Sequence, residues 1–127
     1  MRRSTPPLTT FSLKVLAAAF ILSGEAFADD CVAPAMPEVP EGATATLEEM
    51  IAGQKDVKTF QADAQAFRQC LEDQLSSLKA AAADGDDDAA AAFKTATDAY
   101  NGSVAAEEQV AGDFNTQIRA YKEANPS

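Results

Sequence analysis

The strongest constraint on the fold is a pair of equally long segments, residues 46–83 and 87–124, that share one spacing of apolar side chains. In both, apolar or small residues recur at alternating steps of three and four, the heptad pattern of a helix that packs along another helix. A helix of 38 residues is about 57 Å long. Only three residues join the segments, so the helices must run antiparallel. The sequence therefore predicts an all-α fold, a long, coiled-coil-like antiparallel two-helix hairpin.

The ends of both helices carry recognisable signals. Thr46 and Glu49 form a capping box at the first helix start. After the turn 84–86, the negative charge of Asp87 or Asp88 suits the start of the second helix. Asn125, just before a proline, is a plausible stop.

We call the line of apolar residues along each predicted helix its seam. Glycines interrupt both seams, and the helix is least secure at Gly102, because Asn101-Gly102-Ser103 could end one helix and cap another. The spacing keeps its phase there, so a continuous or kinked helix is preferred to a three-helix bundle. The seam residues are Met50, Gly53, Val57, Phe60, Ala64, Phe67, Leu71, Gln74 or Leu75, and Leu78 in the first helix, and Phe93, Ala96, Tyr100, Val104, Glu107, Ala111, Phe114, Ile118 and Tyr121 in the second.

An extended arm, residues 29–45, precedes the hairpin domain 46–127. Pro34, Pro37 and Pro40 are three residues apart, the repeat of polyproline II, so they should line one edge of the arm and pack on the phenylalanines.

The two cysteines, Cys31 and Cys70, are within reach of each other if the arm folds back along the helices. The 15 residues from Cys31 to Thr46 span about 46 Å when extended, and Cys70 lies about 36 Å into the first helix. An intramolecular disulfide is therefore preferred, with an intermolecular bond or a reactive thiol as alternatives.

Residues 1–28 have the three regions of a secretory signal peptide. Arg2, Arg3 and Lys14 are basic, residues 15–22 are apolar, and Ala26-Phe27-Ala28 is a cleavage site. We expect cleavage after Ala28 and a periplasmic or secreted mature chain without a membrane anchor, because the apolar run is shorter than the roughly 20 residues that span a bilayer.

The mature chain would hold seven basic and nineteen acidic residues. Nucleic acid and anionic lipid bind positive surfaces, so neither is an expected partner. The chain has no His, the commonest general base near neutral pH and the commonest metal ligand.

Several short motifs are spread over most of the mature chain. They are Cys31, Pro37-Glu38-Val39-Pro40-Glu41-Gly42-Ala43-Thr44-Ala45, Met50, Gln54, Val57-Lys58, Phe67 with Cys70-Leu71, Tyr100-Asn101, Phe114-Asn115 and Arg119-Ala120-Tyr121-Lys122. These motifs resemble those of a family of small secreted proteobacterial helical-hairpin proteins with an N-terminal Cys/Pro arm. The resemblance implies a periplasmic helical hairpin with an arm, and it carries over no catalytic residues.

Two groups of acids are weighed as sites. Residues 84–88 match the first half of a calcium loop, but Ala89 and Thr95 stand where that loop needs Gly and Glu, so a solvated turn is favoured over a weak cation site. Glu107 is expected to face a Lys or Arg, or water, rather than to act as an acid or base.

The sequence predicts a non-enzymatic interaction or structural protein that acts through a face of the hairpin, on a protein partner or a second copy. No catalytic residue, metal, cofactor or small-molecule substrate is expected. A strip of partly exposed aromatic residues, Phe60, Phe67, Phe114 and Tyr121, is the expected contact surface. The alternatives are a chaperone-like holder of unfolded clients and a weak cation binder.

Overall fold

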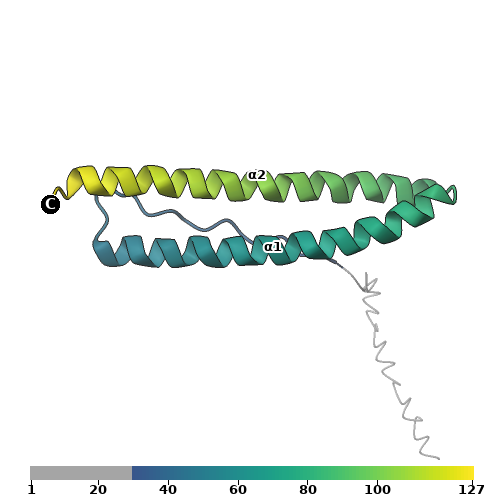
Figure 1. Cartoon of the computed structure of the whole chain (residues 1–127), viewed down its shortest axis with the longest axis horizontal. Coiled ribbons are helices and arrows are strands. Elements are labelled where there is room, and N and C mark those ends of the chain that lie inside the picture. Colours follow the sequence, from purple (N-terminus) through teal and green to yellow (C-terminus); the bar gives the residue numbers. More distant parts are fainter. Residues whose placement is uncertain (1–29) are drawn as a thin grey trace, which may run out of the picture.

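The computed structural model describes residues 30–127, in which two long helices lie side by side and run in opposite directions (Figure 1). Helix α1 spans Leu47–Ala83 and helix α2 spans Asp87–Ala124. The predicted all-α hairpin is confirmed, and its helix bounds differ by a single residue. The signal peptide predicted for residues 1–28 lies outside the described residues. Neither helix is long and apolar enough over any stretch to cross a bilayer.

Side chains cap the starts of both helices, at Thr46 as predicted and at Asp86, one residue before the predicted Asp87 or Asp88. Glu49 N–H donates to Thr46 Oγ1 at 3.2 Å, and Thr46 N–H donates to Glu49 Oε2 at 2.7 Å, which completes the capping box. At the start of α2, the cap is Asp86, whose Oδ1 accepts the Ala89 N–H at 3.0 Å. Gly85 makes the turn with φ of +94°, a conformation that favours glycine.

Helix α2 continues without a break through Gly102, as the phase of the seam predicted. Helix α1 curves toward α2 over its last turns (Figure 1). The last turn consists of the alanines 80–83, whose small side chains let two helix axes approach closely.

The core between the helices consists of two clusters. The first lies in the half of the hairpin away from the turn and contains Met50, Val57, Phe60, Val110 and Phe114. The second, near the middle, contains Phe67, Leu71 and Ala96.

One part of the α2 seam differs from the prediction. Val104 is 37% exposed, whereas Val110, outside the predicted seam, is 1% exposed and the most completely buried large side chain among the described residues. The arm explains the difference, because Val39 and Ala45 pack against the cluster that contains Val110. The heptad spacing was derived for two helices, but here α2 packs against two segments at once, α1 and the arm.

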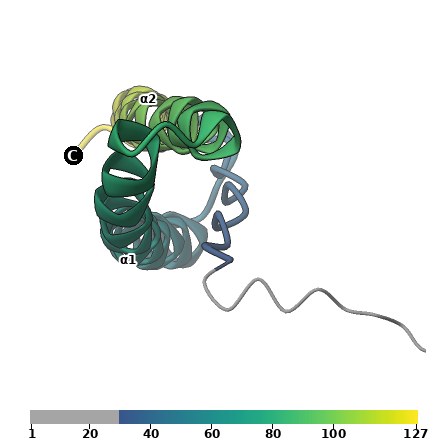
Figure 2. The same cartoon turned by 90° about the vertical axis from the view of Figure 1, so that its right-hand side faces the viewer.

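The arm forms this third layer and lies along one side of the helix pair (Figure 2). Cys31, Pro34, Pro37 and Pro40 are half-buried, while most side chains between them, such as Met36, face solvent. Val39 is the exception, because it is half-buried against the first cluster. This burial at every third residue confirms the predicted edge of an extended arm.

Two glycines seat the arm on the helices. A Cβ at Gly53 of α1 would lie 2.6 Å from ring carbons of Pro40 and 3.3 Å from the Phe114 ring. A Cβ at Gly42 would collide with the backbone carbonyl of Gln117 on α2, and Gly42 N–H donates to Gln117 Oε1 at 2.8 Å. Both glycines therefore permit close approach, which explains why Gly53 is found inside a helix despite its low helix propensity.

Candidate binding groove beside the disulfide

A disulfide joins Cys31 to Cys70, with 5.6 Å between the Cα atoms, and fixes the arm to the middle of α1. The predicted intramolecular pairing is confirmed. Among residues 30–127, the arm therefore covers the half of the hairpin from Cys70 to the start of α1, and no described segment covers the half toward the turn on this side.

A groove of about 910 Å³ begins where the arm ends, and we call it the distal groove. Its volume falls in the range of ligand pockets in proteins. The residues that line it are Asp30, Cys31, Phe67, Cys70, Leu71, Asp73, Gln74, Ser77, Leu78, Ala92, Thr95, Ala96 and Ala99.

The groove exists because side chains on α2 are small where the arm is absent. Ala92, Ala96 and Ala99 lie at steps of four and three, which places them on one face of α2. Across from them, the buried residues of α1 end at Leu71, and Leu78 further along is only half-buried. Apolar surface therefore remains open to solvent between the helices.

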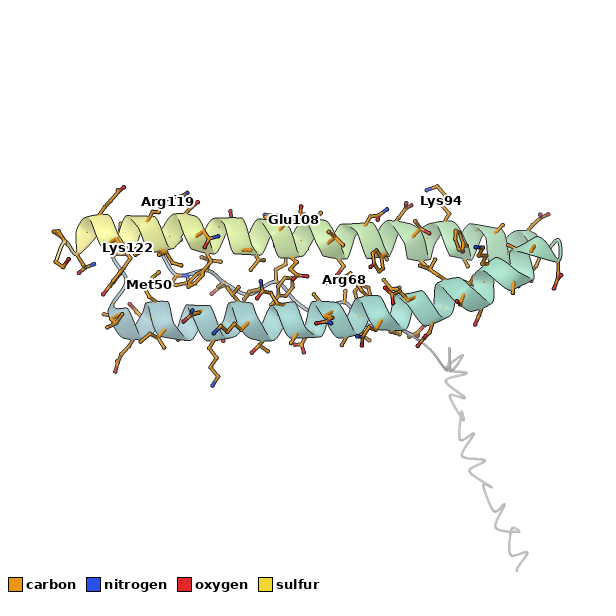
Figure 3. The ribbon with its side chains drawn as sticks, in the orientation of Figure 1. Met50, Arg68, Lys94, Glu108, Arg119 and Lys122 are labelled. Atoms are coloured by element: carbon orange, nitrogen blue, oxygen red, sulfur yellow. A yellow bond between two sulfur atoms is a disulfide. The ribbon has the colours of Figure 1, made fainter. Side chains whose placement is uncertain are left out.

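The charge of this region is negative. Residues 71–99 contain seven acidic residues and two basic residues. Among the described residues that line the groove are two acids, Asp30 and Asp73, and no base. One of the two nearby bases, Lys94, points away from α1 and binds its own helix, with Nζ 2.7 Å from Asp98 Oδ2 (Figure 3). The hydrogen bond from Lys94 to Asp98 raises the pKa of the lysine.

A second, smaller hollow of about 350 Å³ lies between the helices at Arg68 and Glu107. Arg68 Nη2 is 2.7 Å from Glu107 Oε2, and Arg68 Nη1 donates to Ser103 Oγ at 3.1 Å. The prediction that Glu107 faces a basic residue is confirmed. The guanidinium and the carboxylate neutralise each other, and this ion pair links α1 to α2 beside the hollow.

The aromatic contact surface needs correction. Phe60, Phe67 and Phe114 are 4%, 9% and 7% exposed, so their side chains belong to the core and are not open to a partner. Tyr121 is half-buried and packs on the first cluster. The arm again supplies the reason, because as a third layer it completes burial that two helices alone would leave partial.

The distal groove was not predicted, although the sequence held two signals for it. One is the stripe of small residues on α2, and the other is the position of Cys70, which limits how far the arm can reach. Both signals predict a groove only when the side of the hairpin on which the arm lies is known.

The acidic turn behaves as a cap. Asp86 caps α2, and Asp87 and Asp88 lie in its first turn. Within residues 30–127, no three or more Cys, Asp or Glu residues gather in an arrangement that could hold a metal ion.

Comparisons with known proteins return no match to a family model, a curated protein or a solved structure. The resemblance to secreted helical-hairpin proteins therefore stays a prediction.

Proposed function

We propose that this chain is a non-enzymatic interaction protein that binds a protein partner through the distal groove. The observation that carries the proposal is an open, largely apolar groove beside a disulfide that holds its edge in place. Grooves of this kind bury a partner's apolar side chains, which is the main favourable term in association.

The lining of the groove favours binding over catalysis. Apart from Asp30 and Asp73, it consists of apolar, small or neutral polar side chains and the disulfide sulfurs. The two cysteines are bonded to each other and offer no thiolate for nucleophilic attack. The groove is thus suited to hold a side chain, and its described lining residues supply no nucleophile paired with a base.

The alternative of a client holder has weaker support. A holder needs broad exposed apolar surface, and the phenylalanines that would supply it are in the core. The groove occupies only one part of the hairpin, which fits a defined partner better than many unfolded ones.

We also propose that the protein works in the periplasm or outside the cell. The leader-like residues 1–28 and the disulfide support this location, because disulfides persist in oxidising compartments. Fractionation and N-terminal sequencing test it, with Asp29 as the expected first residue. An intact Met1 on cytoplasmic protein would overturn it.

Site-specific photo-crosslinking in cells tests the binding proposal. A photoreactive amino acid replaces Thr95, which lines the groove and is exposed, or Gln109, which is also exposed on α2 but lies outside the groove. We expect one dominant protein adduct from position 95 and none from position 109. Equal adducts at both positions, or none at either, would contradict the proposal, and a broad set of adducts at position 95 would favour the holder.

A further inference from the structure

The arm shows what kind of chain fits between these helices. It lies extended along one side of the pair, and every third side chain from Cys31 to Pro40 turns inward and is half-buried. Apart from Val39, which packs against the first cluster, the side chains between them face solvent. The space between α1 and α2 on this side thus accommodates an extended segment with a repeat of three.

The distal groove continues this space beyond the end of the arm. Asp30 and Cys31 form one end of the groove, and both helices supply its walls without interruption, from Phe67 to Leu78 on α1. That stretch of α1 is about 16 Å long, enough for about five residues of an extended chain.

The chain itself leaves this space open. If the leader is removed after Ala28, as proposed above, only Asp29 precedes Asp30. One residue reaches at most about 3.6 Å, far less than the length of the groove. After this cleavage the segment before Cys31 is too short to fill the groove, and we take the occupant to be a segment of another molecule.

Charge indicates the chemistry of the occupant. Among the described residues that line the groove, Asp30 and Asp73 are acidic and none is basic, and the surrounding residues 71–99 carry a net negative charge. Complementary potentials favour a positive partner and disfavour a negative one. The floor, which includes Leu71, Leu78 and Ala96, calls for apolar side chains.

We propose that the distal groove binds an extended segment of a partner protein that has an apolar side chain at every third position and Lys or Arg between them. This inference rests on the proposed function and names the chemistry of the partner. The bound segment would extend the line of the arm, with its apolar side chains between the helices and its basic side chains at Asp30 and Asp73.

Three synthetic peptides of equal length probe this chemistry by fluorescence anisotropy with the oxidised protein. The first repeats Leu-Lys-Pro, the second repeats Leu-Glu-Pro, and the third places Leu, Lys and Ala at helical spacing with the same charge as the first. We expect the first to bind, and the other two to bind at least about tenfold more weakly.

Matched variants locate the binding. Ala92→Arg puts a long cation into the groove, whereas Ala91→Arg makes the same change at an exposed neighbour that does not line it. We expect a loss of at least about tenfold from the first and less than about twofold from the second. Asp73→Asn should weaken binding about two- to fivefold and flatten its salt dependence, while Asp63→Asn, exposed on α1 outside the groove, should not.

Each result bears on the inference. Equal binding of the Leu-Glu-Pro peptide, tighter binding of the helical peptide, or no binding of the Leu-Lys-Pro peptide would overturn it. So would a self-associated form in sedimentation that Ala92→Arg disrupts, because the occupant would then be a second copy. A persisting photo-crosslink at position 95 would leave the proposed function standing in each case, whereas loss of that crosslink would remove both.

Discussion

The two halves of the hairpin use the same helices but bury them differently. In the arm-covered half, residues 47–70 of α1 and 100–124 of α2, the arm lies over the helix pair, and Met50, Phe60 and Phe114 are buried. In the distal half, residues 71–83 and 87–99, only two helices meet, and Leu78 remains half-buried beside an open groove. Two helices alone make a thin core. The arm, rather than the heptad spacing, therefore determines in which half the core side chains are fully buried.

The disulfide lies at the boundary between the halves. Among the described residues, Cys31 is the half-buried arm residue nearest the turn end of the hairpin. It packs against the cluster that contains Phe67 and Leu71. The bond thus serves both halves, because it fixes the cover of one and forms the edge of the groove in the other.

The largest expected contrast comes from truncating one core side chain in each half. Phe60→Ala, at 4% exposure, should lower the free energy of unfolding by about 3–5 kcal/mol, because it leaves a cavity under the arm. Leu78→Ala in the distal half should cost only about 1 kcal/mol, because the side chain is already in contact with water. Urea denaturation of the oxidised proteins measures both, and equal costs would remove the proposed difference between the halves.

Removal of the disulfide should have the next largest effect. The double variant Cys31→Ser, Cys70→Ser opens a loop with a sequence separation of 39 and should lose about 3–4 kcal/mol of stability in the chain-entropy model. Denaturation with and without reductant measures the loss.

Hydrogen exchange measures which half of the hairpin loses stability when the disulfide is removed. We expect faster exchange in the arm-covered half, at amides such as Gly42, than in the distal half, since only the first loses its cover. As a control, reductant should leave the double variant unchanged. A uniform increase along both helices would mean that the disulfide stabilises the hairpin as a whole.

Much of this fold follows from local sequence signals. The capping box at Thr46, the phase that carries α2 through Gly102, and the reach of Cys31 to Cys70 each depend on a short stretch of chain and elementary geometry. The burial of Val110 and the groove could not be predicted in the same way. They depend on which side of the hairpin the arm covers, and the seam, which describes two helices alone, does not contain that information.

Gly53→Ala tests how closely the arm fits. The added methyl group would stand 2.6 Å from the Pro40 ring, so arm and helix must separate locally. Overpacking costs about 1–3 kcal/mol, and the gain of about 1 kcal/mol in helix propensity offsets part of it. We expect a net loss of about 1 kcal/mol by urea denaturation. If the variant is stabilised, the arm is free to shift, and the close seating at Gly53 does not hold in solution.

Gly102→Ala is the matched opposite case and should give the smallest effect. A Cβ at Gly102 meets nothing within 4 Å, so only the helix propensity changes, and stability should rise by up to about 1 kcal/mol. Gly102 lies close to the boundary between the distal and the arm-covered half of α2. The same variant therefore also tests whether the two halves move relative to each other at this point. If only the melting temperature rises and peptide binding stays constant, α2 acts as one rigid rod and the groove is preformed. If binding weakens as the helix stiffens, the groove widens by bending at Gly102, and a partner would have to select the bent form.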